Sequence, residues 1–200
     1  MAHIPDGLLS VPVLVAGAAV GIAGLAYALR GMDDRSIIRT GLLSAAFFAG
    51  SLISVPIGPS SVHLMLSGLM GLLLGPRIFA AVFVGLCLQV LLFGVGGITT
   101  LGINTVNIAL PGLIFGMVAR PAVLRGKSPK SAAVLAGAVG GLSVLGTAAL
   151  VALCLAITGS EYVPVASIIA VTFVPLALVE AAITATVVAF LTRVEPAALK

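Results

Sequence analysis

The sequence predicts an all-α integral membrane protein with seven transmembrane helices, and three observations support this prediction. Hydrophobic residues make up 60% of the 200 residues, charged residues only 8%, and the mean hydropathy is +1.30. A soluble domain would have about a quarter charged residues. Apolar stretches close to the roughly 20 residues needed to cross a bilayer recur along the whole chain. Finally, all 10 lysines and arginines fall on one side of the membrane if the chain crosses it seven times.

Breaks rich in glycine, proline and polar residues separate the apolar stretches and define the expected helices. The breaks are Gly31-Met-Asp-Asp-Arg35, Pro56-Ile-Gly-Pro-Ser60, Gly75-Pro76, Gly94-Val-Gly-Gly97, Arg125-Gly-Lys-Ser-Pro129 and Thr158-Gly-Ser-Glu161. Within a single membrane domain, 1–200, we expect an N-terminal loop over 1–7. The expected helices then span residues 8–30, 36–55, 61–75, 77–94, 100–120, 130–158 and 164–193.

The positions of the basic residues predict the orientation of the chain. Lysine and arginine flank the first, third and fifth connections and the C-terminal end, whereas the second, fourth and sixth connections contain neither. Because the side of a membrane protein that is rich in these residues faces the cytoplasm, we expect a cytoplasmic C-terminus and an N-terminus outside. The chain is therefore expected to be a multi-pass protein of the cell (plasma) membrane. This topology explains the net charge of +4 without a nucleic-acid partner.

The first residues, Met1-Ala2-His3, place an imidazole within two residues of an amino terminus. An amine, one or two backbone amide nitrogens and a ring nitrogen can surround one cation in a plane. Ni(II) and Cu(II) favour such tetragonal nitrogen coordination. His63 is the other histidine of the chain and follows the second connection, so it lies on the same expected outer side. The sequence therefore predicts a metal site between His3 and His63.

The expected helix over 61–75 is short, which helps the two histidines to meet. Its length of roughly 24 Å is less than the about 30 Å of a hydrocarbon core. Its start is therefore expected below the outer surface, within reach of a loop that enters the bundle. Taken singly, His63 could instead cap a helix, and His3 could belong to a disordered terminus. Pro5 and an Asp6-Gly7 turn argue against disorder, and Asp6 or Ser10 could cap the first helix.

Several polar residues lie within the expected spans, where polar groups are costly and usually face the bundle interior. Gln89, Asn104 and Asn107 could hydrogen-bond to the backbone of the inserted loop and support the metal ligands, or could make ordinary contacts between helices. Glu180 is the acidic residue deep in a span. It could transfer the proton of a self-sufficient proton-coupled metal permease, or it could be a buried, partnered structural residue.

Small residues four apart allow helices to approach closely. Ala45 and Ala49 form such a face on the second expected helix, either for packing within the chain or for contact with another membrane subunit. The sequence contains no HExxH, GxSxG or CxxC motif, so we expect no enzymatic activity. Besides a metal-binding transport protein and a proton-coupled permease, these residues leave open a third hypothesis, a structural or assembly protein of the membrane.

Beyond these features, the chain resembles the substrate-specific membrane component of cobalt/nickel energy-coupling factor (ECF) transporters, the CbiM/NikM type, over nearly its whole length. The similar segments are His3-Ile-Pro-Asp-Gly-Leu-Leu-Ser10, Pro56-Ile-Gly-Pro-Ser-Ser-Val-His-Leu64, Gly68-Leu-Met-Gly-Leu-Leu-Leu-Gly75, Gln89-Val-Leu-Leu-Phe-Gly94, Gly96-Gly-Ile-Thr-Thr-Leu-Gly-Ile-Asn-Thr105 with Asn107, and Glu180-Ala-Ala-Ile-Thr184. The resemblance implies an ECF-type bundle with one extra N-terminal helix and an N-terminal loop that binds the ion.

The resemblance also implies a ligand set and partners. The family binds the ion through the terminal amine, the amide and ring nitrogens of its second residue, and a histidine of the third helix, which His3 and His63 match. Ala45 and Ala49 resemble its contact motif for the coupling membrane subunit. ATPase subunits, and often a small accessory membrane subunit, complete such transporters. The implied function is high-affinity capture of Ni²⁺, with Co²⁺ as the alternative, from the outer side for ATP-driven import.

One departure from the family concerns the terminal residue, because the family usually begins Met-His and Ala2 intervenes here. If Met1 is removed, the amine of Ala2, the amide and ring of His3 and the ring of His63 supply four nitrogens. If Met1 stays, its amine, two amides and the His3 ring already supply four, and His63 becomes axial or superfluous. The sequence leaves both arrangements open.

Overall fold

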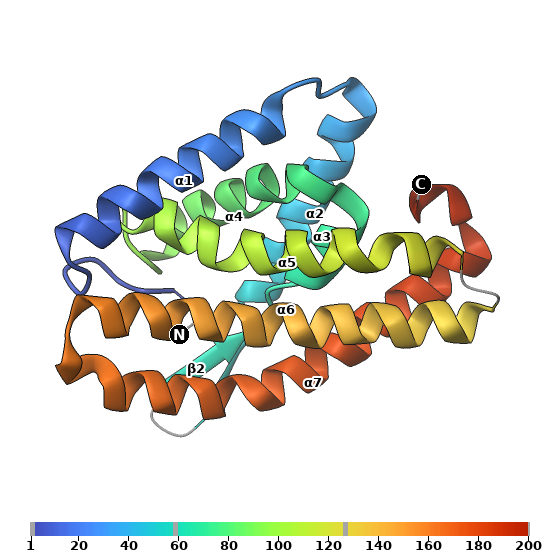
Figure 1. The fold of residues 1–200 in the computed structure, drawn as a ribbon. Helices are drawn as coiled ribbons and strands as arrows, with labels where there is room; N and C mark the ends of the chain where they lie inside the picture. Colours follow the sequence, from blue (N-terminus) through green and yellow to red (C-terminus); the bar gives the residue numbers. More distant parts are fainter. Residues whose placement is uncertain (1–2, 58–59, 126–127, 200) are drawn as a thin grey trace.

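The computed structural model describes residues 3–57, 60–125 and 128–199, and within them the chain forms a bundle of seven α-helices with one β-hairpin (Figure 1). The helices are α1 (Val11–Leu29), α2 (Asp34–Ser51), α3 (Ser67–Leu74), α4 (Ile78–Phe93), α5 (Leu101–Leu124), α6 (Pro129–Thr158) and α7 (Val163–Val194). Three short 3-10 helices are η1 (Gly75–Arg77), η2 (Ser160–Tyr162) and η3 (Pro196–Leu199), and the hairpin consists of β1 (Ser54–Ile57) and β2 (Ser60–His63).

Five helical segments are long and apolar enough to cross a membrane. They are Val11–Leu29, Ser67–Phe93, Leu101–Leu124, Pro129–Thr158 and Val171–Val194. The helical membrane fold is therefore confirmed, whereas the seven crossings and their direction stay predictions. The helix α2 falls outside this group because Asp34, Arg35 and Arg39 lie near its start. The helices α3 and α4 belong to one apolar segment of 27 residues, Ser67–Phe93.

The third helix differs most from its prediction over 61–75. Residues 60–63 form the strand β2, which pairs antiparallel with β1 so that Ser54 lies opposite His63. The helix α3 begins only at Ser67 and has 8 residues, a length of about 12 Å. Leu66, directly before it, has a φ of 51°, in the left-handed region that cannot continue a right-handed helix. The expected helix over 61–66 is therefore wrong, and one short hairpin interrupts the otherwise helical bundle.

Three other helix ends differ by three or four residues from the expected ranges, and the first is α1, which begins at Val11 rather than at 8. The helix α2 ends at Ser51 rather than at 55, because β1 begins at Ser54. The helix α5 continues to Leu124 rather than ending at 120. It continues through Pro121, which lacks the N–H that would otherwise bond to the carbonyl of Met117.

The short helix α3 lies in the centre of the bundle, and its packing depends on glycine. A Cβ at Gly71 of α3 would overlap the carbonyl oxygen of Gly112 of α5, so both helices need glycine for this approach. Beside it, the long helices α6 and α7 run side by side and are joined at one end by η2 (Figure 1). The main core contains fully buried Phe47, Ile78 and Phe173.

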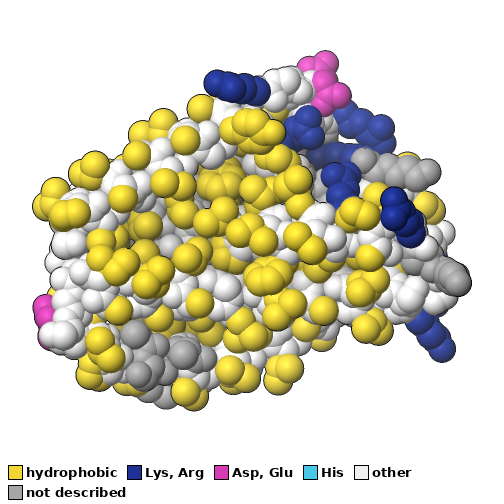
Figure 2. Space-filling view, in the orientation of Figure 1, with side chains coloured by type: hydrophobic (Ala, Val, Ile, Leu, Met, Phe, Trp, Pro, Cys, Tyr) yellow, Lys and Arg dark blue, Asp and Glu magenta, His cyan; other side chains and the backbone are white. Residues whose placement is uncertain are grey.

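The outer surface is mostly apolar, unlike the surface of a soluble protein. Large apolar side chains such as Leu91 and Val118 are 78% and 77% exposed, and apolar atoms cover the flank of the bundle in Figure 2. Lysine and arginine side chains gather at the end that holds the α1–α2 connection, η1, the end of α5 and the C-terminal segment (Figure 2). The N-terminal segment runs inward from the opposite end (Figure 1). The two ends of the bundle are therefore chemically distinct.

Candidate metal centre

The two histidines meet inside the bundle, near the end opposite the arginines. His3 precedes α1, and His63 is the last residue of β2; their side chains are 3% and 7% exposed. The Nε2 atoms lie 2.8 Å apart, and the rings stack with centroids 4.8 Å apart. Two ligands at adjacent corners of a square around a metal, with bonds of about 2.0 Å, would lie about 2.8 Å apart. The ring nitrogens are thus spaced as two adjacent ligands of one ion.

The hydrogen bonds around His63 assign its protonation. Its Nδ1 lies 3.0 Å from the carbonyl oxygen of Leu64, which can only accept, so Nδ1 donates and Nε2 keeps its lone pair toward His3. A ring nitrogen whose partner nitrogen donates to a carbonyl is the usual form of a metal-binding histidine. The Nδ1 of His3 is buried and has no partner among the described residues. Of the two nitrogens of the His3 ring, only Nδ1 can close a chelate ring with the amide of its own residue, so this mode of binding requires the ring to turn from the orientation in which its Nε2 faces His63.

Both rings are neutral at physiological pH. Burial, followed by the charge of the His63 ring, lowers the pKa of His3 to about 3. Burial also lowers the pKa of His63, although the hydrogen bond to Leu64 opposes this. Because neutral imidazole is the form that binds metal, the two side chains need not lose a proton to become ligands.

Asn104 of α5 fixes the backbone next to His3. Its Oδ1 accepts from the N–H of Ile4 at 3.0 Å, and its Nδ2 donates to the carbonyl of Ile4 at 3.0 Å. The same Nδ2 also donates to the hydroxyl of Thr100. The side chain of Ile4 is buried against Ile103 and Leu155. One side chain therefore satisfies both main-chain groups of Ile4, and the N-terminal segment is inserted as a paired, ordered element.

Asp6 provides a second set of hydrogen bonds that holds the N-terminal segment in place. Its carboxylate accepts from the backbone N–H groups of Ile98, Thr99 and Thr100 at 3.0, 3.0 and 3.3 Å, and from the hydroxyl of Thr99. The hydrogen bond from Thr99 is the main reason that the pKa of Asp6 lies below its ordinary value. A carboxylate at these amides, next to the first turn of α5, suits the positive end of the helix dipole. Asp6 thus interacts with the start of α5 rather than capping the first helix.

Ser10 occupies the N-cap position of α1 but makes no capping hydrogen bond with its side chain. Gly97 precedes the amides that bind Asp6, and a Cβ at this position would overlap the carboxylate. The segment from Gly97 to Thr100 therefore forms a close-fitting seat for Asp6. No local pattern in the sequence connects Asp6 with this segment.

Glu180 of α7 holds the chain on the other side of His63. Its fully buried carboxylate accepts from the N–H of Met65 at 2.5 Å and from the N–H of Leu66 at 2.8 and 3.1 Å. These amides lie immediately before α3 and would otherwise lack partners inside the bundle. Glu180 therefore fixes the segment that follows His63 and Leu64, a role that the sequence left open between a proton carrier and a partnered structural residue.

Among the described residues, the remaining predicted supporting residues make no hydrogen bond to the N-terminal segment. Gln89 is 2% exposed, and both atoms of its amide lack a hydrogen-bond partner there. Asn107 is 1% exposed, and its Oδ1 accepts from the thiol of Cys154 at 3.8 Å. Both side chains are buried amides of α4 and α5, so of the three predicted residues only Asn104 is seen to bond to the loop.

The other predicted residues lie apart from the histidines or outside the described part of the chain. Ala45 and Ala49 are exposed on one face of α2. Met1 and Ala2 lie outside the described residues. Within residues 3–57, 60–125 and 128–199, no third His, Cys, Asp or Glu joins the two histidines to form a metal-binding group.

An apolar cavity of about 460 Å³ opens beside His3, between the N-terminal segment and α6 and α7. Ile4, Leu155, Tyr162 and Ile169 belong to its lining. A hydrated cation gains nothing from such a lining. We therefore regard the cavity as part of the apolar surroundings that keep the histidines neutral.

Comparison with known proteins points in the same direction as this geometry. Residues 3–198 match the family CbiM, cobalt uptake substrate-specific transmembrane region. A Haemophilus influenzae protein provisionally named a metal transport protein is 33% identical over 195 residues, which cover 97% of this chain and 95% of that protein. A provisionally named fused nickel transport protein, NikMN, of Archaeoglobus fulgidus is 38% identical over 143 residues, covering 69% of this chain and 48% of that protein. The crystal structure of a transition metal transporter superposes with a TM-score of 0.75 at 25% identity, covering 96% of this chain and 93% of that one.

Proposed function

This chain belongs to the CbiM family of cobalt-uptake substrate-specific transmembrane components, and from this premise we propose that it captures Ni²⁺, with Co²⁺ as the second candidate, from the outer side of the plasma membrane. The chain would then deliver the ion as the substrate-specific subunit of an ATP-driven ECF transporter. The observation on which the proposal rests is the 2.8 Å contact between the Nε2 atoms of His3 and His63. Two neutral, buried imidazoles at this spacing, next to a chain terminus, fit a nitrogen-only cation site.

The preference for nickel rests on the ligand chemistry. A planar set of nitrogens suits Ni²⁺ and excludes Mg²⁺ and Ca²⁺, which favour oxygen ligands. Cu²⁺ would bind more tightly by intrinsic order, so selectivity in the cell would depend partly on metal availability. The names of the relatives include both metals, since the family is described by cobalt and the Archaeoglobus protein by nickel.

The proposed ligands are the rings of His3 and His63, the amide of His3 and a terminal amine. The adjacency of the two rings supports the arrangement in which Ala2 supplies the amine and His63 the fourth nitrogen in the plane. With Met1 retained, its amine and two amides would fill the plane with the His3 ring, and His63 would be an axial ligand or superfluous. Asn104 would hold the loop in place, and Gln89 and Asn107 are further candidates for support.

Transport needs energy that we assign to partner subunits. These would be ATPase subunits, a coupling membrane subunit and a small accessory membrane subunit. The exposed Ala45 and Ala49 on α2 offer a flat face for a helix of the coupling subunit.

The alternative, a proton-coupled permease that uses Glu180, is not favoured, because the carboxylate of Glu180 is engaged by two backbone amides beside the site. Membership in a transport family also sets aside the reading as a purely structural membrane protein.

The first experiment is an Ni²⁺ titration of the purified chain, compared with a version extended by a few residues at the N-terminus, with the intact mass of each recorded. We expect tight 1:1 binding that is lost on extension, and a mass that identifies the terminal residue. Because both imidazoles are already neutral, the protons released at pH 7 should come from the amine and the amide, about two per ion. Equal binding by both versions would contradict a terminal amine ligand.

A second experiment tests the transport step. Proteoliposomes with the full partner set should accumulate Ni²⁺ only when ATP is supplied. ATP-independent uptake by the chain alone, abolished by Glu180→Gln, would overturn the proposal in favour of the permease.

A further inference from the structure

Four arginines surround one cavity at the end of the bundle opposite the histidines. The cavity has a volume of about 490 Å³ and is lined by Arg35 and Arg39 of α2, Arg77 of η1 and Arg120 of α5. These residues come from three elements that are separate in the sequence. Asp33 is the carboxylate in the lining, so the cavity has an excess of three positive charges.

The excess of three already counts Asp33, whose carboxylate is also engaged at the start of α2. Its side chain accepts from the backbone N–H of Ser36 and caps α2. The guanidinium of Arg39 donates to the carbonyl of Ala197 at 3.3 Å, but a guanidinium has five N–H donors. Like charges brought together in this way repel one another unless an anion lies between them. The cavity therefore has the charge and the donors to receive an anion.

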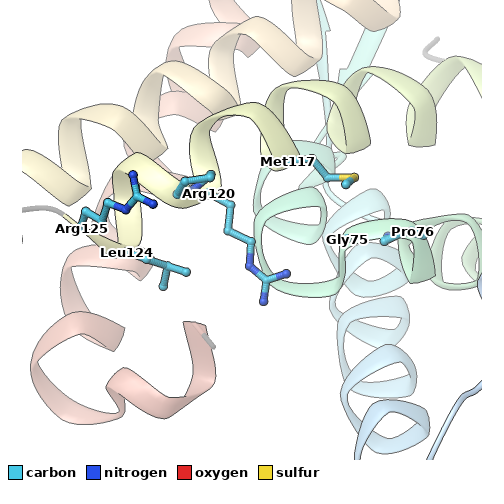
Figure 3. A pocket seen from close by; sticks show the side chains of 7 residues that line it. Gly75, Pro76, Met117, Arg120, Leu124 and Arg125 are labelled. Carbon is cyan, nitrogen blue, oxygen red and sulfur yellow. The ribbon is translucent and has the colours of Figure 1, made fainter.

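A second cavity of about 320 Å³ adjoins the first at Arg120. Its lining is mostly apolar, with Pro76, Met117 and Leu124, and also includes Arg125 at its edge. Figure 3 shows the side chain of Arg120 extending from α5 into the space between Leu124 and Pro76. Met117 and Leu124 are 51% and 45% exposed on the flank of the bundle. One arginine thus forms the border between a cationic and an apolar compartment.

We propose that these adjoining cavities bind one anionic phospholipid. Its phosphate diester would lie among Arg35, Arg39 and Arg77, and part of an acyl chain would lie along Met117 and Leu124, with Arg120 between them. Guanidinium groups match phosphate oxygens with paired hydrogen bonds. Basic pockets between membrane helices on the cytoplasmic side are a recurrent form of headgroup site. Free phosphate would satisfy the arginines alone, whereas a phospholipid uses both compartments.

The test is native mass spectrometry of the full chain in detergent with added dioleoylphosphatidylglycerol, dioleoylphosphatidylcholine or inorganic phosphate. We expect one phosphatidylglycerol per chain to be retained in preference to phosphatidylcholine, and inorganic phosphate not to displace it at equal concentration. The variants Arg39→Gln and Arg77→Gln should each weaken retention by about fivefold. Arg193→Gln removes the same charge from an exposed position at the same end, outside both cavities, and should retain the lipid like the parent.

Several results would overturn the proposal. Equal retention of the two lipids, or an equal loss in Arg193→Gln, would reduce the effect to general surface charge. Displacement by inorganic phosphate would identify a site for a soluble anion. Unchanged lipid retention, together with lost association of the ATPase or coupling subunits, would identify a protein contact. An Ni²⁺ titration at the far end verifies folding, and Arg35→Gln, at an exposed side chain, replaces any variant that fails this check.

Discussion

The two ends of this bundle are built from opposite kinds of side chain. At one end, His3, His63 and Asn104 are uncharged and almost fully buried, and their hydrogen bonds go mostly to the main chain. At the other end, arginines dominate, and Arg39 and Arg77 are partly exposed around a cavity. The first end offers neutral, buried nitrogens, as the proposed cation site requires. The second is arranged to keep its charge near water, lipid or a partner.

This difference shows why the two tasks are kept apart. A cation site of neutral nitrogens depends on low solvent exposure, which keeps the imidazoles unprotonated. A basic cluster near the site would repel the ion, and a burial like that of His3 would make the arginines costly. Separating the two along the length of the bundle avoids both costs. The predictions below test whether the ends are independent, and whether the histidine end works as one connected unit.

The largest effect is expected from removing a ligand. His63→Ala, and separately His3→Ala, should weaken Ni²⁺ binding by more than about 100-fold, beyond the range that loss of a supporting residue costs. Isothermal titration of the purified chain measures this. Arg193→Gln, at the opposite end, should bind Ni²⁺ like the parent. Comparable weakening in that control would mean that the two ends are not independent.

The next effect concerns the anchor of the N-terminal segment. Asn104→Ala leaves the N–H and C=O of Ile4 buried without partners, at about 1–3 kcal/mol for each group. We expect Ni²⁺ affinity to fall by about 10–100-fold and the segment before α1 to become sensitive to hydrogen exchange. Thr105→Ala is the matched control, because its hydroxyl donates within its own helix to Leu101. If both variants bind Ni²⁺ equally, Asn104 does not position the site.

Glu180→Gln should have a smaller effect and weaken Ni²⁺ binding by about tenfold. The change removes the charge but keeps one acceptor oxygen for the amides of Met65 and Leu66, so the segment after His63 should loosen without unfolding. Thr184→Val is the control, since Thr184 is a buried polar residue on the same helix. Uptake with the full partner set should persist at reduced rate, and its dependence on a proton gradient should not change. If uptake proves to be driven by a proton gradient and Glu180→Gln abolishes it, the hypothesis of a proton-coupled permease would be favoured instead.

The helical fold of the bundle could be predicted from the sequence, because long apolar stretches form helices through local composition alone. The meeting of His3 and His63 could be predicted as well, since the chain has two histidines and the expected third helix was too short to span. Asn104 was also a correct candidate for a bond to the loop.

The hairpin and the two carboxylate contacts could not be predicted, for a common reason. Each depends on partners far apart in the sequence. Glu180 binds an amide 115 residues away, at Met65, and this contact holds the chain out of helix where the sequence favoured one. Asp6 binds amides 92 to 94 residues away, before α5. Carboxylates that pair with backbone amides leave no spacing pattern, so only the folded chain reveals them.

The smallest effect is expected at the seat of Asp6, and it distinguishes a tether from a ligand. Gly97→Ala should displace the carboxylate and weaken Ni²⁺ binding by about tenfold or less, as should Asp6→Asn. Gly41→Ala is the control, because a Cβ there meets nothing within 4 Å. Loss of binding as complete as in His63→Ala would make Asp6 a ligand. An unchanged affinity in Gly97→Ala would show that the tether does not matter.

The tether should also give the histidine end a dependence on pH that the asparagine variant lacks. The hydrogen bond from Thr99 holds the pKa of Asp6 below its ordinary value. A carboxyl with a pKa lowered by folding stabilises the folded state above its unfolded pKa of about 3.9, and this contribution is lost as the pH falls through the lowered value. Thermal unfolding in detergent should therefore show the parent to be more stable than Asp6→Asn at pH 5, with the difference shrinking toward pH 3. A difference that is constant over this range would mean that the charge of Asp6 contributes nothing, and that the histidine end is held by Asn104 and Glu180 alone.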